Sequence, residues 1–172
     1  MAEPIPHPRM LIAIVSDTHL PRGRRTLPQP CVEAIRGADL LLHAGDVVSL
    51  SALADLMGIG PPVKSVRGNV DAPELRRELP ERLELTLEGV AIGMVHDAGP
   101  PQGRTPRLRR LFPEAAAVVF GHTHIPFHAT TDDGFQIFNP GSPTERRRAA
   151  TRSMGIAEVR EETIDFRYLT LQ

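Results

Sequence analysis

The sequence predicts an α/β fold in which a two-sheet, mixed β-sandwich is flanked by helices. Three observations lead to this prediction. Short runs of aliphatic and β-branched residues have the length and composition of buried strands. Stretches with helical spacing of apolar residues lie between several of these runs. The last third of the chain instead contains paired strand patterns joined by tight turns, which a purely parallel sheet would not contain.

Five apolar runs are predicted to form the buried strands. They occupy residues 10–15, 39–42, 63–66, 90–95 and 116–120. Three intervening stretches, 30–36, 50–57 and 104–112, carry apolar residues at spacings compatible with helices. The alternation of strand and helix is typical of α/β architecture.

Two hairpins are predicted after the last of these strands. Residues 126–131 and 135–138 flank the turn sequence Asp132-Asp133-Gly134, and residues 154–159 and 163–169 flank residues 160–162. Antiparallel pairs of this kind make the expected sheets mixed.

Length and composition predict one domain. The chain has 172 residues, of which 41% are hydrophobic and 24% charged, so a single domain over residues 10–172 is expected after a flexible tail over residues 1–9. No apolar run is long enough to span a membrane, and the first residues lack the apolar core of a secretory signal. Cys31 is the single cysteine, which excludes an intrachain disulfide and favours the cytoplasm. A formal net charge of -1 and few aromatic residues argue against nucleic acid and membrane partners. Whether the chain forms a homo-oligomer stays open.

Polar residues follow each of the five predicted strands. The segments are 17–19, 45–46, 68–71, 96–97 and 121–124. Loops that leave the carboxyl ends of neighbouring strands converge on one crevice in α/β folds, so these segments are expected to meet in space.

The side chains in these segments form a set typical of a metal site. It comprises two aspartates, four histidines and one asparagine, namely Asp17, His19, Asp46, Asn69, His96, His122 and His124. Oxygen and imidazole ligands without thiolates suit Mn, Fe, Zn or Ni, and suit Mg less well. Seven ligands serve two divalent ions if one carboxylate bridges them.

The ordered motifs resemble those of the calcineurin-like metallophosphoesterases, and more closely their small bacterial and archaeal phosphodiesterase branch. The resemblance runs from about residue 11 to 168 and rests on DTH (17–19), GD (45–46), GNxD (68–71), a strand-terminal histidine at 96, GHTH (121–124) and NPGS (139–142). It implies an α/β/β/α fold and two divalent ions, with Mn favoured. It further implies hydrolysis of a small phosphate ester by a metal-bridging hydroxide.

The resemblance also implies individual residue roles. Asp17, His19 and His124 would bind the first ion, and Asn69, His96 and His122 the second. Asp46 would bridge the two ions. The residues expected nearest the chemistry are Asp46, His96 and His122.

Val70 is the main departure from the family pattern. Many members have a histidine at this place that can protonate the leaving group, and valine cannot transfer a proton. The small phosphodiesterase branch commonly lacks this histidine, so Val70 agrees with that branch and predicts poor hydrolysis of basic leaving groups. Asp71 lies beside it and is expected to be able to orient a histidine introduced there.

Several residues near the motifs have alternative interpretations. Asp97 either orients His96 or caps its loop, with the cap favoured, and His43 either supports the metal site or packs in the core. The NPGS loop is expected to be chiefly structural. Arginines that follow the first and last motifs either grip phosphate or are solvated, namely Arg22, Arg24, Arg25, Arg146, Arg147 and Arg148. Those at 107, 109 and 110 are expected on the exposed face of their helix.

Three functions compete at this point. A phosphodiesterase is favoured, and Val70 argues against a phosphomonoesterase. The third alternative is a protein-interaction scaffold, because the eukaryotic retromer complex contains a subunit of this fold with an impaired metal site. All seven expected ligands are present here, which argues for catalysis.

Overall fold

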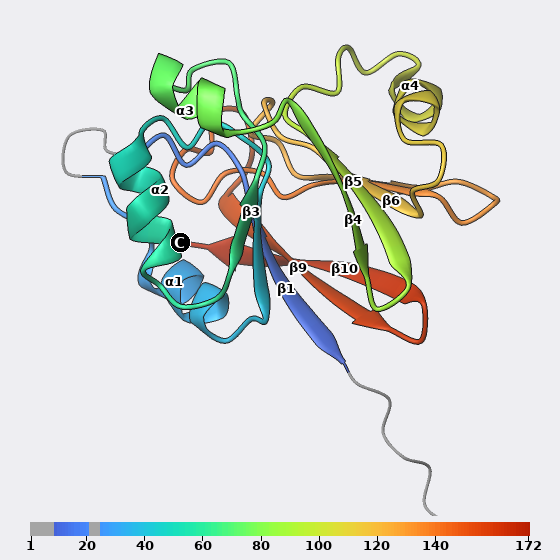
Figure 1. Cartoon of the computed structure of the whole chain (residues 1–172), viewed down its shortest axis with the longest axis horizontal. Helices are drawn as coiled ribbons and strands as arrows, with labels where there is room; N and C mark the ends of the chain where they lie inside the picture. Colours follow the sequence, from blue (N-terminus) through green and yellow to red (C-terminus); the bar gives the residue numbers. More distant parts are fainter. Residues whose placement is uncertain (1–8, 21–24) are drawn as a thin grey trace, which may run out of the picture.

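Two five-stranded sheets form the centre of the protein. The computed structural model describes residues 9–20 and 25–172, and within these ranges the sheets have the orders β10-β9-β1-β2-β3 and β4-β5-β6-β8-β7 (Figure 1). Both sheets are mixed: the second has antiparallel pairs at both edges, whereas the first has parallel pairing up to its β3 edge and antiparallel pairing at the β9–β10 side. The predicted mixed two-sheet sandwich is therefore confirmed.

The first sheet combines the beginning and the end of the chain. Its strands are β1 (Met10–Val15), β2 (Leu40–His43), β3 (Val63–Ser65), β9 (Arg152–Arg160) and β10 (Thr163–Leu171). The β9–β10 pair is the second predicted hairpin, and β9 pairs antiparallel with β1.

The second sheet is built from the middle of the chain. Its strands are β4 (Arg82–Leu87), β5 (Val90–Val95), β6 (Ala117–Val119), β7 (Phe127–Thr130) and β8 (Gln136–Asn139). Here β7 and β8 form the first predicted hairpin, and β8 runs parallel to β6.

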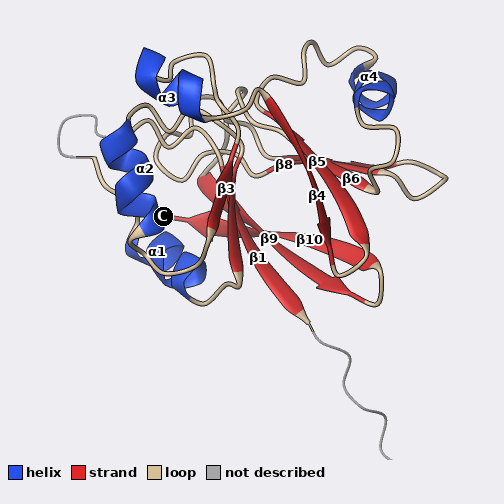
Figure 2. Ribbon diagram, in the orientation of Figure 1, coloured by secondary structure: helices blue, strands red, loops and turns tan. Residues whose placement is uncertain are grey.

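Four helices in the described residues accompany the sheets. They are α1 (Gln29–Arg36), α2 (Leu50–Met57), α3 (Pro73–Glu78) and α4 (Arg104–Leu111). Figure 2 shows α1 and α2 beside the first sheet and α4 on the far side, next to the second sheet. No helix in the described ranges is long and apolar enough to cross a membrane.

Alternation along the strands divides the interior into three apolar layers. Ile12 and Ile14 point into the layer between the sheets, together with Ile92 and Phe138 from the second sheet. The intervening positions of β1 face the layer under α1 and α2, and a third layer joins α4 to the second sheet. Because successive strand residues point to opposite faces, both sheets are covered on both sides.

The structure adds two elements that the sequence prediction omitted. Strand β4 alternates between exposed and half-buried residues, with Leu83, Leu85 and Leu87 against the central core. A search for continuous apolar runs passes over such a half-buried edge strand. Helix α3 has six residues and buries only Leu75, so its apolar periodicity is too short to recognise. The predicted tail over residues 1–9 lies outside the described residues except for Arg9.

Candidate metal centre

The seven predicted ligands come together where the carboxyl ends of strands from both sheets meet. Asp17 and His19 follow β1, Asp46 follows β2 and Asn69 follows β3 in the first sheet. Residues 96, 122 and 124 follow β5 and β6 in the second sheet. The site therefore lies between the two sheets rather than along the edge of one.

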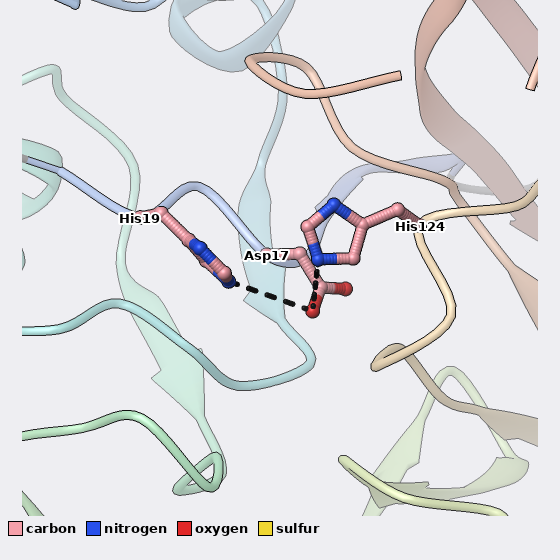
Figure 3. A group of neighbouring side chains, drawn as sticks. All are labelled: Asp17, His19 and His124. Atoms are coloured by element: carbon pink, nitrogen blue, oxygen red, sulfur yellow. Dashed lines mark ion pairs between the residues drawn. The ribbon is translucent and has the colours of Figure 1, made fainter. Parts of the chain in front are cut away.

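Asp17, His19 and His124 form a buried cluster (Figure 3). Oδ1 of Asp17 lies 3.3 Å from Nε2 of His124 and 3.9 Å from Nε2 of His19. The two rings meet edge to face, with centroids 5.0 Å apart. Three potential ligand atoms thus face one point.

Asn69, His96 and His122 form a second, more open cluster. Oδ1 of Asn69 lies 3.1 Å from Nε2 of His96 and 3.0 Å from Nδ1 of His122. His96 is buried, His122 is half-buried and Asn69 is exposed. A molecule arriving from solvent therefore meets this cluster first.

Asp46 lies between the two clusters. Its Oδ2 is 3.3 Å from Nε2 of His19 and 3.2 Å from Nε2 of His96, so one carboxylate oxygen contacts a histidine from each cluster. Its Oδ1 accepts a hydrogen bond of 2.9 Å from the Val70 amide. This is the position that a bridging carboxylate requires.

Unsatisfied buried atoms show that the site fits a cation. Oδ1 of Asp17 and both ring nitrogens of His124 are buried and have no hydrogen-bond partner. A buried, unpartnered carboxylate oxygen is costly unless a cation compensates it. Carboxylate, imidazole and amide groups are suitable ligands for a borderline divalent ion, so the residues fit the predicted metal.

Burial and mutual contacts separate the pKa values of the acidic and basic groups. Burial raises the pKa of Asp17 to about 6, although His96 partly opposes this. Burial also acts against ionisation of Asp46, but hydrogen bonds from His19 and His96 hold its pKa well below the usual range. The pKa of His96 rises to about 9, because Asp46 and Asp17 outweigh the effect of its burial. A proton on His96 would have to leave before the ring could bind a metal.

Left-handed backbone conformations are concentrated at the site. Five of the seven predicted ligands have positive φ, between 48° and 68°: Asp17, His19, Asp46, His122 and His124. Residues other than glycine rarely adopt this region, and such strain is characteristic of functional sites.

His43 supports the loops that carry the ligands. It is fully buried, its Nδ1 accepts a hydrogen bond from the Gly45 amide, and its Nε2 donates to Oγ1 of Thr18. Burial lowers its pKa to about 3, with His96 adding to the effect. A neutral His43 therefore connects the segment of Asp17 and His19 to the segment of Asp46.

Asp97 and Asp71 act on the backbone. Asp97 is exposed and accepts a hydrogen bond of 2.7 Å from the Gly99 amide, so the predicted loop cap is confirmed. His96 instead has its Nδ1 2.7 Å from the Ala44 carbonyl. Both carboxylate oxygens of Asp71 accept backbone amide hydrogen bonds. Asp71 thus already holds two backbone amides, and its ability to orient a histidine at position 70 stays a prediction.

The NPGS loop has the predicted structural role. Nδ2 of Asn139 donates to the Gly121 carbonyl, and Oγ of Ser142 donates to the Asp17 carbonyl, both at 2.9 Å. The loop thus connects the segments that carry Asp17 and His122.

The arginines near the motifs have different surroundings. Arg25 and Arg147 are both paired with Glu145, and Arg147 and Arg148 line a hollow of about 330 Å³ with Thr123 and Ile125 beside the site. Positions 22 and 24 lie outside the described residues. The arginines at 107 and 109 are half-buried and bind loop carbonyls and Asp133 respectively, so only position 110 is exposed as predicted.

Glu145 is the neighbour of the site that sequence reasoning missed. Its Oε2 lies 3.6 Å from Nδ1 of His124 and 3.9 Å from Nδ1 of His19. It follows the NPGS motif by three residues and lies within an arginine-rich segment. No spacing rule would connect it to His124, which lies more than 20 residues earlier, or to His19, which lies more than 120 residues earlier.

Comparisons with known proteins agree with this geometry. The model of the calcineurin-like phosphoesterase superfamily domain matches residues 10–162. A probable metallophosphoesterase of Methanothermobacter thermautotrophicus is 38% identical over 140 residues, which cover 80% of this chain and 80% of the relative.

Solved structures share the architecture. A Thermotoga maritima protein superimposes with a TM-score of 0.74 at 31% identity, covering 94% of this chain and 99% of the other. An archaeal phosphodiesterase has a TM-score of 0.69 at 20% identity, covering 93% and 100%. Zinc-complexed Vps29 from Entamoeba histolytica has a TM-score of 0.70 at 18% identity, covering 95% and 100%. At these lower identities the last two matches show the fold alone.

Proposed function

Because the chain belongs to the calcineurin-like phosphoesterase superfamily, we propose that it is a phosphodiesterase that holds two divalent ions and hydrolyses a small phosphate diester. The observation that carries the proposal is the position of Asp46 Oδ2, within 3.3 Å of a histidine nitrogen from each cluster. A single carboxylate in that place can neutralise and space two cations.

The ligand roles follow the two clusters. Asp17, His19 and His124 would hold one ion, Asn69, His96 and His122 the other, and Asp46 both. When bound, two such ions activate a water and stabilise the charge that develops on the phosphoryl group. Mn²⁺ is the favoured ion because imidazole nitrogens make up four of the seven ligand groups.

The remaining side chains would bind and orient the substrate. The more open cluster faces solvent, and the hollow lined by Thr123 and Ile125 offers the guanidinium groups of Arg147 and Arg148 to an anionic ester. Ile125, which is 42% exposed, adds apolar surface to the same hollow. Val70, which is 46% exposed, adds apolar surface next to Asn69 of the open cluster. A phosphate diester with an apolar or aromatic group matches this combination.

Val70 affects how the leaving group can depart. In the hydrolysis the oxygen of a water forms the new bond to phosphorus while the bond to the departing alcohol oxygen breaks. No side chain at position 70 can give that oxygen a proton, so the alcohol leaves largely as an anion. Aryl diesters should therefore react much faster than alkyl diesters.

A substrate and metal series tests the proposal. Metal-free protein is loaded with Mn²⁺ or Mg²⁺, and kcat/KM is measured for matched monoesters and diesters of graded leaving-group pKa. Asp46→Asn serves as the site variant and Asp55→Asn, on the exposed part of α2, as its control. We expect activity with Mn²⁺ to exceed that with Mg²⁺, diesters to exceed monoesters, and only the Asp46 variant to lose activity.

Other outcomes identify the competing functions. Diesterase activity that survives complete chelation would exclude a metal mechanism. Higher kcat/KM for monoesters would favour a phosphomonoesterase. A protein that fills its site with metal but hydrolyses neither class of ester would favour the interaction scaffold.

A further inference from the structure

We propose that Glu145, held by Arg25, is a positioning residue that orients both His19 and His124 for metal binding. The inference rests on the proposed function, because it concerns the same metal centre. Oε2 of Glu145 faces Nδ1 of both rings, at 3.9 Å and 3.6 Å. The opposite nitrogen of each ring, Nε2, faces Oδ1 of Asp17.

This arrangement gives the two nitrogens of each ring separate tasks. A carboxylate beside Nδ1 favours the tautomer with its proton on Nδ1, which leaves the Nε2 lone pair free for a cation. It also increases the basicity of the ring and limits its rotation. One carboxylate can serve both histidines because their rings meet edge to face, with an interplanar angle of 86°.

The arginines explain why a carboxylate can be held in this place. The Glu145 side chain is only 14% exposed, and Arg25 forms an ion pair with its Oε1. Nε of Arg147 lies 3.8 Å from Oε2. The two guanidinium groups compensate the negative charge of the carboxylate that faces the two rings.

Backbone contacts fix the distance between Glu145 and the metal site. The Glu145 amide donates to Oγ of Ser142 at 3.0 Å, and the same hydroxyl donates to the Asp17 carbonyl at 2.9 Å. Oγ1 of Thr144 donates to the Thr18 carbonyl at 2.8 Å. The segment that carries Glu145 is thus attached directly to the segment that carries Asp17 and His19.

Metal binding, measured without reference to activity, tests the role of Glu145. The variants are Glu145→Gln, which keeps the size of the side chain and removes its charge, and Arg25→Gln, which keeps the carboxylate and removes its anchor. Glu158→Gln is the matched control, because Glu158 on β9 is also paired with an arginine but contacts none of the site histidines in the described structure. Mn²⁺ affinity and stoichiometry are measured by calorimetry on metal-free protein, with electron paramagnetic resonance to distinguish coupled from isolated ions.

We expect Glu145→Gln to weaken the binding of one ion by about 10- to 100-fold, the usual effect of losing a partner that orients a ligand. At Mn²⁺ concentrations that fill the parent protein, the variant should hold one ion and show the spectrum of isolated Mn²⁺. Arg25→Gln should produce a smaller loss of the same ion, and Glu158→Gln none.

The inference and the proposed function can fail separately. If the parent binds two ions and Glu145→Gln binds them equally well, Glu145 has no positioning role, even if the metal-free variant unfolds at a lower temperature. Equal losses in Glu145→Gln and Glu158→Gln would also overturn the inference. A parent protein that binds no Mn²⁺ would overturn the proposed function and this inference with it.

Discussion

Replacement of Gly68 by alanine should displace the carboxylate that lies between the two ligand clusters. A Cβ atom on Gly68 would overlap Oδ1 and the amide nitrogen of Asp46 and would lie 2.7 Å from Asp46 Cγ, where ordinary contacts begin at 3.4 Å. Oδ1 overlaps more closely than Cγ, so the Asp46 carboxyl group must retreat by more than about 1 Å, and the Asp46 backbone must shift as well. A misplacement of about 1 Å in an active site can cost about 100-fold in rate, so we expect kcat/KM for an aryl diester to fall by roughly that factor.

Gly37→Ala is the matched control. Gly37 follows α1 with φ of -83°, and a Cβ there would meet the Glu33 carbonyl at 3.5 Å, which is ordinary contact. Both variants are compared for kcat/KM, Mn²⁺ stoichiometry and thermal unfolding, and Gly37→Ala should match the parent in the first two. A Gly68→Ala protein with parental kcat/KM and metal content would refute the reasoning, because the overlap would then be relieved without moving Asp46.

Three further predictions concern residues around the site. Val70→His should accelerate the hydrolysis of alkyl diesters more than that of aryl diesters. The gain should stay below the roughly 100-fold lower bound typical of a positioned acid, because Asp71 already accepts hydrogen bonds from two backbone amides. Equal acceleration of both classes, measured across a leaving-group series, would contradict this prediction. Burial lowers the pKa of His43 from 6.5 to about 3, so between these values the unfolded chain binds a proton that the native protein does not. The free energy of unfolding of the metal-free protein should therefore fall as the pH decreases, and its slope should be steeper than that of His43→Gln by about 1.4 kcal/mol per pH unit. Equal slopes for the two proteins in denaturant titrations would exclude a neutral, buried His43. Burial also raises the pKa of Cys31 to about 12, so iodoacetamide should modify this thiol only after unfolding, as mass spectrometry would show.

The central strands and the metal ligands could be predicted from sequence because both have local signatures. Strands β1 and β5 have the predicted bounds, since six consecutive apolar residues in each are covered on both faces. The ligand segments were recognisable because each directly follows such a strand. Strand β4 was missed because only one of its faces packs on the core, so its apolar residues alternate with polar ones.

Contacts between distant segments could not be predicted in the same way. Glu145 is significant only because the NPGS loop brings it beneath two imidazole rings, and its own sequence context indicates a solvated, charged loop. The same holds for His43, whose partners Thr18 and Gly45 come from two different strand ends. Such positions depend on how loops meet, which neither propensity nor periodicity describes.

The left-handed backbone at the ligands shows how the fold offsets a local cost. An L-residue in this conformation costs about 1 to 2 kcal/mol, and nothing in the local sequence favours it at His122, whose φ is 68°. Backbone hydrogen bonds hold His122 in this conformation, and one of them runs from the His122 amide to Oδ2 of Asp17 over 3.0 Å. Glycine would remove the strain but would supply no ligand.

Metal-free His122→Gly should therefore be more stable than His122→Ala by about 1 kcal/mol, because both lose the imidazole but only alanine keeps the strain. Asn69 provides the control, since it belongs to the same cluster but is not among the residues with positive φ. There the order should reverse, with Asn69→Gly less stable than Asn69→Ala. Denaturant unfolding of all four variants in chelator gives the comparison. The same order at both positions would show that the hydrogen bonds alone, and not the strained conformation, determine the stability of the empty site.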